Sequence, residues 1–153
     1  MKTSAGIVLY KEHLNKIYFF LVHPGGPYWK KKDAGAWSIP KGEILGDENP
    51  LERAKLEFQE ETGMQIDGAF TALSPIKQKS GKLVMAWAVK GNIANSGFSS
   101  NLIDIEWPPR SGKSVRIPEV DQWEWFSFED AQKRINPAQI PLLMETFRLA
   151  TGT

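Results

Sequence analysis

The stretch that begins at Gly42 and reads GEILGDENPLERAKLEFQEETGM constrains this chain more than any other segment. Asn49 followed by Pro50 is a typical helix start, because an Asn side chain accepts hydrogen bonds from free backbone amides and Pro suits the first helical position. Gly63 is the matching helix stop. The stretch therefore predicts a helix over residues 50–62.

One arc of this predicted helix carries three carboxylates. At about 100° per residue, Glu57 and Glu61 lie about 40° apart, and Glu60 lies about 60° to the other side of Glu57. The stripe expected to face the core consists of Leu51, Ala54 and Phe58. Carboxylates this close repel one another, so a hard divalent cation such as Mg²⁺ or Mn²⁺ is the obvious partner. For the helix alone, a solvated acidic face is an equally open interpretation.

The residues around the carboxylates follow a known spacing. The pattern is Gly, five residues, Glu, seven residues, Arg-Glu, an apolar residue, any residue, Glu-Glu, any residue, Gly and an apolar residue. The matching positions are Gly42, Glu48, Glu57, Phe58, Glu60, Glu61, Gly63 and Met64. The segment resembles the Nudix box of the Nudix hydrolases, with Leu56 in place of the usual Arg.

Segments outside the box extend the resemblance over most of the chain. WSIPKG at 37–42 resembles the W-x-x-P-K-G lead-in of a Nudix subset that includes diadenosine polyphosphate and diphosphoinositol polyphosphate hydrolases. Glu119, with Trp125 six residues later, resembles the late Glu of the family and the segment that follows it. HPGGPYW at 23–29 and EWPPRSG at 106–112 resemble a bacterial subgroup of predicted nucleoside triphosphate pyrophosphohydrolases.

Leu56 and Glu48 are the two box positions whose roles stay open. In the family, the Arg at the position of Leu56 is understood to orient the catalytic glutamates through ion pairs. Leu56 lies roughly opposite the apolar stripe, so packing does not demand a Leu there. We hypothesise that Arg53, one turn before Glu57, supplies the lost charge; the competing interpretation is a weakened or retuned site. Glu48 either binds metal through water or only helps to hold the loop.

Composition agrees with a single domain over residues 1–153. The chain is 41% hydrophobic and 24% charged, which is ordinary for a globular protein. A net charge of +1 gives no argument for binding bulk nucleic acid or a membrane. Without cysteine there is no disulfide, thiol nucleophile or cysteine zinc site, and two histidines make a histidine metal site unfavoured. No long apolar run or signal-peptide pattern is present, so we expect a cytoplasmic location.

The remaining segments predict an α/β protein. We expect strands at 4–10, 16–23, 69–78, 82–90 and 122–126. Residues 25–35 and 91–117 are expected as loops, the second long enough to be functional or mobile. Further helices are expected from Ser127 and over 137–150. The resemblance implies the Nudix fold, an α/β/α sandwich with a mixed β-sheet.

The resemblance also implies roles for individual residues. Glu57 and Glu61 are the expected main ligands of one to three Mg²⁺ or Mn²⁺ ions, and Glu60 is a further ligand or the base. The backbone carbonyl near Gly42 is expected to complete the metal shell. Glu119 is the candidate late acid, as ligand or general base, although a solvated loop carboxylate is an alternative. The acids that compete for its role are Glu106, Asp104, Asp121 and Glu124.

Basic and aromatic residues indicate the kind of substrate. Lys41, beside the box, is expected to contact a phosphate. Tyr28 and Trp29 lie next to three lysines and can form a lip that stacks a base and binds phosphate, although a solvated lysine run is the commoner reading. Arg110, in the long loop, can clamp a polyphosphate.

The leading prediction is a metal-dependent pyrophosphohydrolase that cleaves a diphosphate linkage in a nucleoside triphosphate or dinucleoside polyphosphate. ADP-ribose-like sugars, diphosphoinositol compounds and RNA 5′ ends remain open as substrates. The alternative is a catalytically weak or silent Nudix-fold module that binds a nucleotide as a sensor; Leu56 favours it, and the retained acids oppose it. Both a monomer and a homodimer are open.

Overall fold

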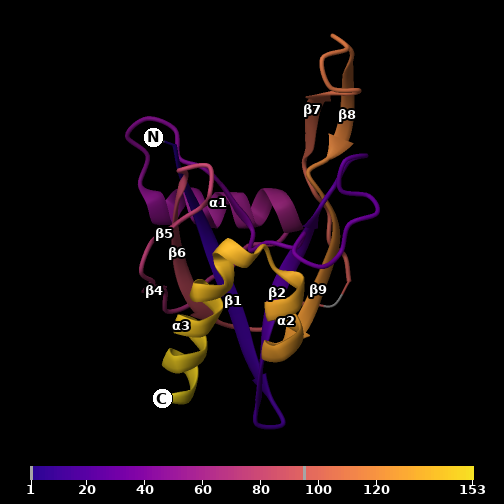
Figure 1. Cartoon of the computed structure of the whole chain (residues 1–153). Coiled ribbons are helices and arrows are strands. Elements are labelled where there is room, and N and C mark those ends of the chain that lie inside the picture. Colours follow the sequence, from indigo (N-terminus) through magenta and orange to yellow (C-terminus); the bar gives the residue numbers. More distant parts are fainter. Residues whose placement is uncertain (1, 95) are drawn as a thin grey trace.

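A mixed β-sheet forms the centre of the protein in the computed structural model, which describes residues 2–94 and 96–153 (Figure 1). Its strands are β1 (Thr3–His13), β2 (Lys16–Pro24), β3 (Lys41–Glu43), β4 (Thr71–Ala72), β5 (Ile76–Lys77), β6 (Leu83–Lys90) and β9 (Val120–Ser127). The main order is β4-β6-β1-β2-β9, with β3 paired to β1 and β5 paired to β6. Strands β1 and β6 are parallel and the other pairs are antiparallel, which confirms the expected mixed sheet.

Helices cover both faces of this sheet. The helical elements are α1 (Pro50–Thr62), α2 (Phe128–Arg134), the 3₁₀ helix η1 (Pro137–Gln139) and α3 (Ile140–Thr151). Figure 1 shows α1 behind the sheet and α2 and α3 in front of it. Ile7 and Leu9 of β1 pack on the α1 side, whereas Val8 between them packs on the α2 and α3 side, as the period-two alternation of a strand requires. These layers confirm the α/β/α sandwich. No helix within the described residues is long and apolar enough to cross a membrane.

Helix α1 has the bounds that its local signals predict. The Asn49 side chain accepts a hydrogen bond from Glu52 N at 3.1 Å, and Gly63 takes the left-handed conformation with φ 75°. The Phe58 side chain is fully buried, whereas Leu56 is 40% exposed, so the apolar residue in the box faces solvent. The amphipathic pattern of α1 therefore orients the acidic arc as well as the core face.

The prediction of a loop over residues 91–117 is wrong for the second half of that range. Residues there form the antiparallel hairpin of β7 (Leu102–Glu106) and β8 (Ser114–Pro118), a separate two-stranded sheet that projects from the body (Figure 1). Ile103 pairs with Ile117, and Ile105 pairs with Val115. These side chains are only half-buried, so the alternation that produces the hairpin carries a weak apolar signal between proline and glycine residues.

Two further expectations need smaller corrections. The strand expected at 69–78 is split into β4 and β5, with Pro75 immediately before β5, because proline cannot donate to a sheet ladder. The helix expected at 137–150 begins with the 3₁₀ turn η1 before α3 continues to Thr151. The strand expected at 122–126 and the helix start at Ser127 are confirmed, with β9 longer at both ends.

Truncation of Phe58 tests whether α1 is held mainly by its buried face. The Phe58→Ala variant is expected to lose about 3–5 kcal/mol of unfolding free energy, because it opens a cavity under the sheet. Leu56→Ala, two residues earlier on the exposed side, is the matched control and is expected to stay within about 0.5 kcal/mol of the parent. Urea unfolding followed by circular dichroism measures both; equal losses would contradict the packing described here.

Candidate active site

Three charged residues from distant parts of the chain meet in one cavity of about 220 Å³. Lys41 begins β3, Glu61 lies in the last turn of α1, and Glu119 lies between β8 and β9. The sheet accounts for the meeting, because Ala5 of the central strand pairs with Gly42 and so holds β3 beside α1. The charge of Lys41 lowers the pKa of the Glu61 carboxyl in part, against the larger effect of burial, so the two side chains are close enough to interact.

The two box carboxylates nearest the sheet are buried. Glu57 is 8% exposed and Glu61 is 4% exposed. The Oε2 atom of each has no hydrogen-bond partner among the residues that the structure describes. Buried carboxylate oxygens without partners are costly, and a bound cation would offset that cost.

Gly42 makes room for one of these carboxylates. A Cβ atom at position 42 would lie 1.8 Å from Oε1 of Glu57, a separation that no real contact allows. Any side chain there would therefore displace Glu57. The φ angle of Gly42 lies outside the left-handed region, so backbone conformation does not require a glycine there. The close approach of strand β3 to the helix does require one.

The charges in this site perturb one another. Burial raises the pKa of Glu57 to about 7, and the negative charges of Glu60 and Glu119 add to the effect. Burial, followed by Glu119 and Glu57, raises the pKa of Glu61 well above its ordinary value. Burial also raises the pKa of Glu119, and burial lowers the pKa of Lys41. The cluster is thus short of positive charge, which a divalent cation would supply.

The residues fit such a cation, although the site is not a preformed metal cage. Within residues 2–94 and 96–153, no three His, Asp or Glu side chains already stand in a metal-holding arrangement. Mg²⁺ is usually held by one or two carboxylates, with waters and substrate phosphates completing its shell. The unpartnered oxygens of Glu57 and Glu61 are donors of this kind, and the half-buried Glu60 lies close enough for its charge to raise the pKa of Glu57.

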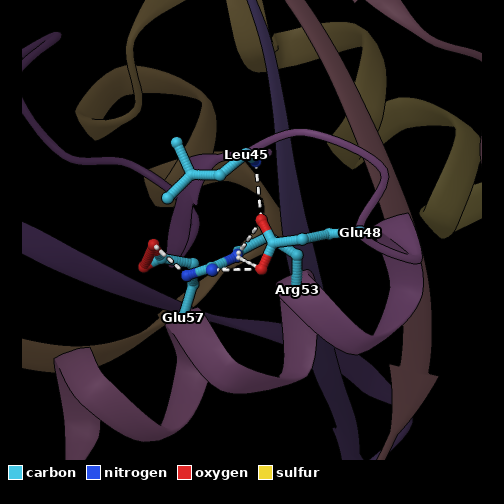
Figure 2. A network of polar contacts seen from close by, with 4 residues as sticks. All are labelled: Leu45, Glu48, Arg53 and Glu57. Atoms are coloured by element: carbon cyan, nitrogen blue, oxygen red, sulfur yellow. Dashed lines mark hydrogen bonds and ion pairs between the residues drawn. The ribbon is translucent and has the colours of Figure 1, made fainter.

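Arg53 connects the box loop to the acidic arc (Figure 2). Its Nε donates to both carboxylate oxygens of Glu48 at 3.1 Å, and its Nη2 also contacts Glu48. Its Nη1 lies 3.6 Å from Oε1 of Glu57, one turn along the helix. Glu48 in addition accepts a hydrogen bond from Leu45 N at 2.6 Å. Of the two roles left open for Glu48, holding the loop is the one that these contacts describe.

Part of the cavity lining was missed by sequence reasoning. Besides the expected Trp29, the cavity is lined by Ser38, Gln78, Asn136 and Gln139. The buried Gln139 accepts a hydrogen bond from Ile39 N at 3.1 Å and donates one to Ser38 Oγ at 3.0 Å, so it ties η1 to the segment before Lys41. No motif marks these amides, and only their polar character within otherwise apolar segments could have drawn attention to them.

The loop at 25–35 is fastened to the sheet. The buried ring of His23 contacts Asp121 Oδ1 at 2.7 Å through Nδ1 and Lys32 O at 2.6 Å through Nε2. Lys32 Nζ lies 3.7 Å from the centroid of the Tyr28 ring, and Tyr28 meets Trp29 edge-on. Trp29 therefore lines the cavity from a loop held by these contacts, whereas Tyr28 is 54% exposed and does not line the cavity.

Arg110 and the competing acids lie elsewhere. Arg110 is exposed in the turn of the hairpin and does not line the cavity. Glu106 accepts hydrogen bonds from backbone amides of that turn, at 3.0 Å from Arg110 N and 3.1 Å from Gly112 N. Asp104 pairs with Arg116 on the hairpin, and Asp121 pairs with His23. Of the acids considered for the late position, the structure brings Glu119 to the cavity with the box.

The raised pKa of Glu57 predicts a pH dependence of stability. Its pKa rises from an ordinary 4.5 to about 7 on folding, so the folded protein binds this proton more tightly than the unfolded chain. The unfolding free energy is therefore expected to fall as pH rises from about 4.5 to about 7. Urea unfolding in EDTA should show a shallower fall in Glu57→Gln, with the exposed Glu52→Gln as control. Equal slopes in both variants would contradict the assignment.

Comparisons with known proteins agree with the fold. The family model of the NUDIX domain matches residues 1–146. A Caenorhabditis elegans Ap4A hydrolase in a binary complex superposes with a TM-score of 0.65 at 22% identity, covering 99% of this chain and 98% of that one.

Two further structures share the fold. The NUDIX domain of Shewanella oneidensis NrtR, complexed with ADP ribose, gives a TM-score of 0.64 at 15% identity over 97% of this chain and 87% of that one. A mutT/nudix family protein from Listeria innocua gives 0.65 at 15% identity over 99% and 94%. No curated protein matches the chain. The family match over nearly the whole chain shows that this protein belongs to the NUDIX domain family.

Proposed function

We propose that this chain is a metal-dependent Nudix hydrolase that cleaves a diphosphate linkage in a nucleoside polyphosphate. The observation that carries the proposal is the pair of buried carboxylates, Glu57 and Glu61, each with an unpartnered oxygen; Glu61 shares a cavity with Lys41 and Glu119. The family match and the Ap4A hydrolase among the structural neighbours support a hydrolase acting on pyrophosphate bonds.

Different acids are proposed to bind the cation and to accept the proton. Glu57 and Glu61 would hold Mg²⁺ or Mn²⁺, with Glu60 and the Gly42 carbonyl as further donors. When bound, the cation supplies positive charge for the phosphate oxygens and lowers the pKa of a water. Glu119 is proposed as the base that takes the proton from the attacking water, and its raised pKa suits that task; Glu60 is the other candidate.

The cavity also provides contacts for the substrate. Lys41 is proposed to contact a phosphate, since it shares the cavity with the acids. Trp29, which also lines the cavity, is proposed to stack against a base, and the exposed Tyr28 beside it is proposed to extend that surface. Arg110 enters only as a contact for the far end of a long polyphosphate, because it sits in the hairpin turn. The neighbours in complex with ADP ribose and named as Ap4A hydrolase support a nucleotide of this general size.

A nucleotide-binding module without turnover is the second candidate. Two observations favour it: Leu56 is exposed where the motif has an arginine, and NrtR shows a NUDIX domain complexed with ADP ribose. The buried acids oppose it, because a binding module gains nothing from carboxylates that lower its own stability. A cytoplasmic location, and a state of monomer or homodimer, remain part of the proposal.

A hydrolysis screen tests the proposed activity. Wild-type protein would be offered nucleoside triphosphates, dinucleoside polyphosphates, ADP-ribose and nucleotide sugars with Mg²⁺ or Mn²⁺, and products would be identified by chromatography. Glu61→Gln is expected to lower turnover by at least about 100-fold, because it removes a proposed ligand. Turnover that survives in Glu61→Gln, or in EDTA, would contradict a metal-dependent reaction at this site.

Substitution of Arg53 tests whether it serves in place of the missing box arginine. Arg53→Ala is expected to lower kcat and to weaken Mn²⁺ binding about 10-fold or more, because Glu57 loses its ion-pair partner and Glu48 loses its donors. Arg53→Lys keeps the charge without the bidentate geometry, so its kcat and Mn²⁺ affinity should lie between those of wild type and Arg53→Ala. Titration of Mn²⁺ by electron paramagnetic resonance, beside steady-state kinetics, measures both effects; unchanged values in Arg53→Ala would end the hypothesis.

Substitution of Trp29 tests the stacking role. Trp29→Ala is expected to raise KM for a nucleotide substrate by about 5-fold to 100-fold with little change in kcat, because a stacked base is worth roughly 1–3 kcal/mol. Trp29→Phe retains a ring and should lose less. Competition by the free nucleoside measures the same contact without chemistry, and an equal inhibition constant in Trp29→Ala and wild type would exclude stacking there.

A further inference from the structure

The projecting hairpin joins the body of the protein through two residues that are hydrogen-bonded to each other. Asn101 immediately precedes β7, and Glu119 immediately follows β8. The backbone N–H of Glu119 donates to the backbone carbonyl of Asn101 at 3.0 Å. The candidate late acid therefore stands at the root of the hairpin, directly across from Asn101.

The same root holds the end of helix α1. The backbone N–H of Asn101 donates to the carbonyl of Glu60 at 2.8 Å, and that of Ser99 donates to the carbonyl of Thr62 at 3.0 Å. The indole N–H of Trp123 donates to the carbonyl of Glu61 at 2.6 Å. These are carbonyls that a helix end leaves without partners inside the helix. Asn101 thus touches the peptide of Glu60 with its N–H and that of Glu119 with its carbonyl.

The side chain of Asn101 adds a third link. Ser100 Oγ donates to the backbone carbonyl of Asn101 at 2.8 Å and lies 3.4 Å from its Oδ1, so the oxygen of the Asn101 amide lies on the side of Ser100 and its N–H₂ remains available as a donor. Burial raises the pKa of Glu119, and the neighbouring Asn101 side chain lowers it in part. Ser100 Oγ in turn accepts a hydrogen bond from Val120 N at 3.0 Å, so the Ser100 hydroxyl beside Asn101 is held in place.

We propose that Asn101 is a positioning residue that fixes the Glu119 carboxylate relative to the acids at the end of α1. The inference rests on the proposed function of the site and names a residue outside the box that this function needs. The backbone of Asn101 sets the distance between the peptides of Glu60 and Glu119, and its amide sets the direction of the carboxylate. Because the backbone links do not depend on the side chain, the amide can be removed while the hairpin root stays in place.

The test compares two variants of similar shape with a control. Asn101→Leu removes the donor, and Asn101→Asp replaces it with a charge that repels Glu119. Asn92→Leu, an exposed asparagine in the same connection, is the control and is expected to behave as wild type. With the substrate found by hydrolysis, kcat is expected to fall about 10-fold to 100-fold in Asn101→Leu and further in Asn101→Asp, with KM changed less than about 3-fold.

A double-variant cycle separates positioning from a general structural effect. If Asn101 acts through Glu119, then Asn101→Leu should cause no further loss of kcat in a Glu119→Gln background. A loss of the same size in both backgrounds would overturn the proposal, as would a change in KM alone. If Asn101→Leu fails to fold by circular dichroism, the decision passes to Asn101→Asp with the same criteria.

Measurement of Mn²⁺ binding distinguishes a failure of this proposal from a failure of the proposed activity. If wild-type protein turns over none of the substrates, the proposed function has failed and the affinity for Mn²⁺ alone becomes the criterion. The expected result is then an affinity about 10-fold to 100-fold weaker in Asn101→Leu than in wild type and in Asn92→Leu. Equal affinities, or no Mn²⁺ binding by the wild type, would overturn the proposal.

Discussion

The burial of two glutamates between α1 and β3 is the constraint on which the rest of the site depends. Glu57 and Glu61 lie where the helix meets the sheet, and taking carboxylates out of water is costly unless their charge is compensated. Neighbouring residues offset part of that cost: Gly42 gives Glu57 room, Nη1 of Arg53 lies 3.6 Å from Glu57, and the charge of Lys41 acts on Glu61. What these partners leave uncompensated is the charge that a divalent cation would balance.

The parts of the fold that sequence predicted well are those fixed by local signals. Helix α1 has its expected bounds because Asn49 and Gly63 act on their own neighbours in the chain. The hairpin of β7 and β8 was missed because its pairing residues, such as Ile103 and Ile117, are half-buried and stand outside the main sheet. Its signal is a weak alternation of side chains, which prolines and glycines in the same stretch obscure.

The residues of the candidate site also fall into those that local spacing predicts and those that it does not. The acids of α1 could be predicted because one helix sets their spacing, and Arg53 could be proposed because it lies one turn from Glu57. The amides of Gln78 and Gln139 could not, because they reach the cavity only through the folding of distant segments. Asn101 belongs to this second kind, since its importance lies in hydrogen bonds to Glu60 and Glu119 that no spacing in the sequence encodes.

The parallel pairing of β1 with β6 has a consequence for how the protein folds. Thr3 stands opposite Leu83, so helix α1 lies within the long connection between two neighbouring strands. Closing that connection costs chain entropy, and non-local strand pairing of this kind slows folding. Strands β1 and β3, on which α1 packs, precede residue 83, so a nascent chain released before β6 would already carry the box together with these strands. It would still lack Glu119 and the parallel partner of β1.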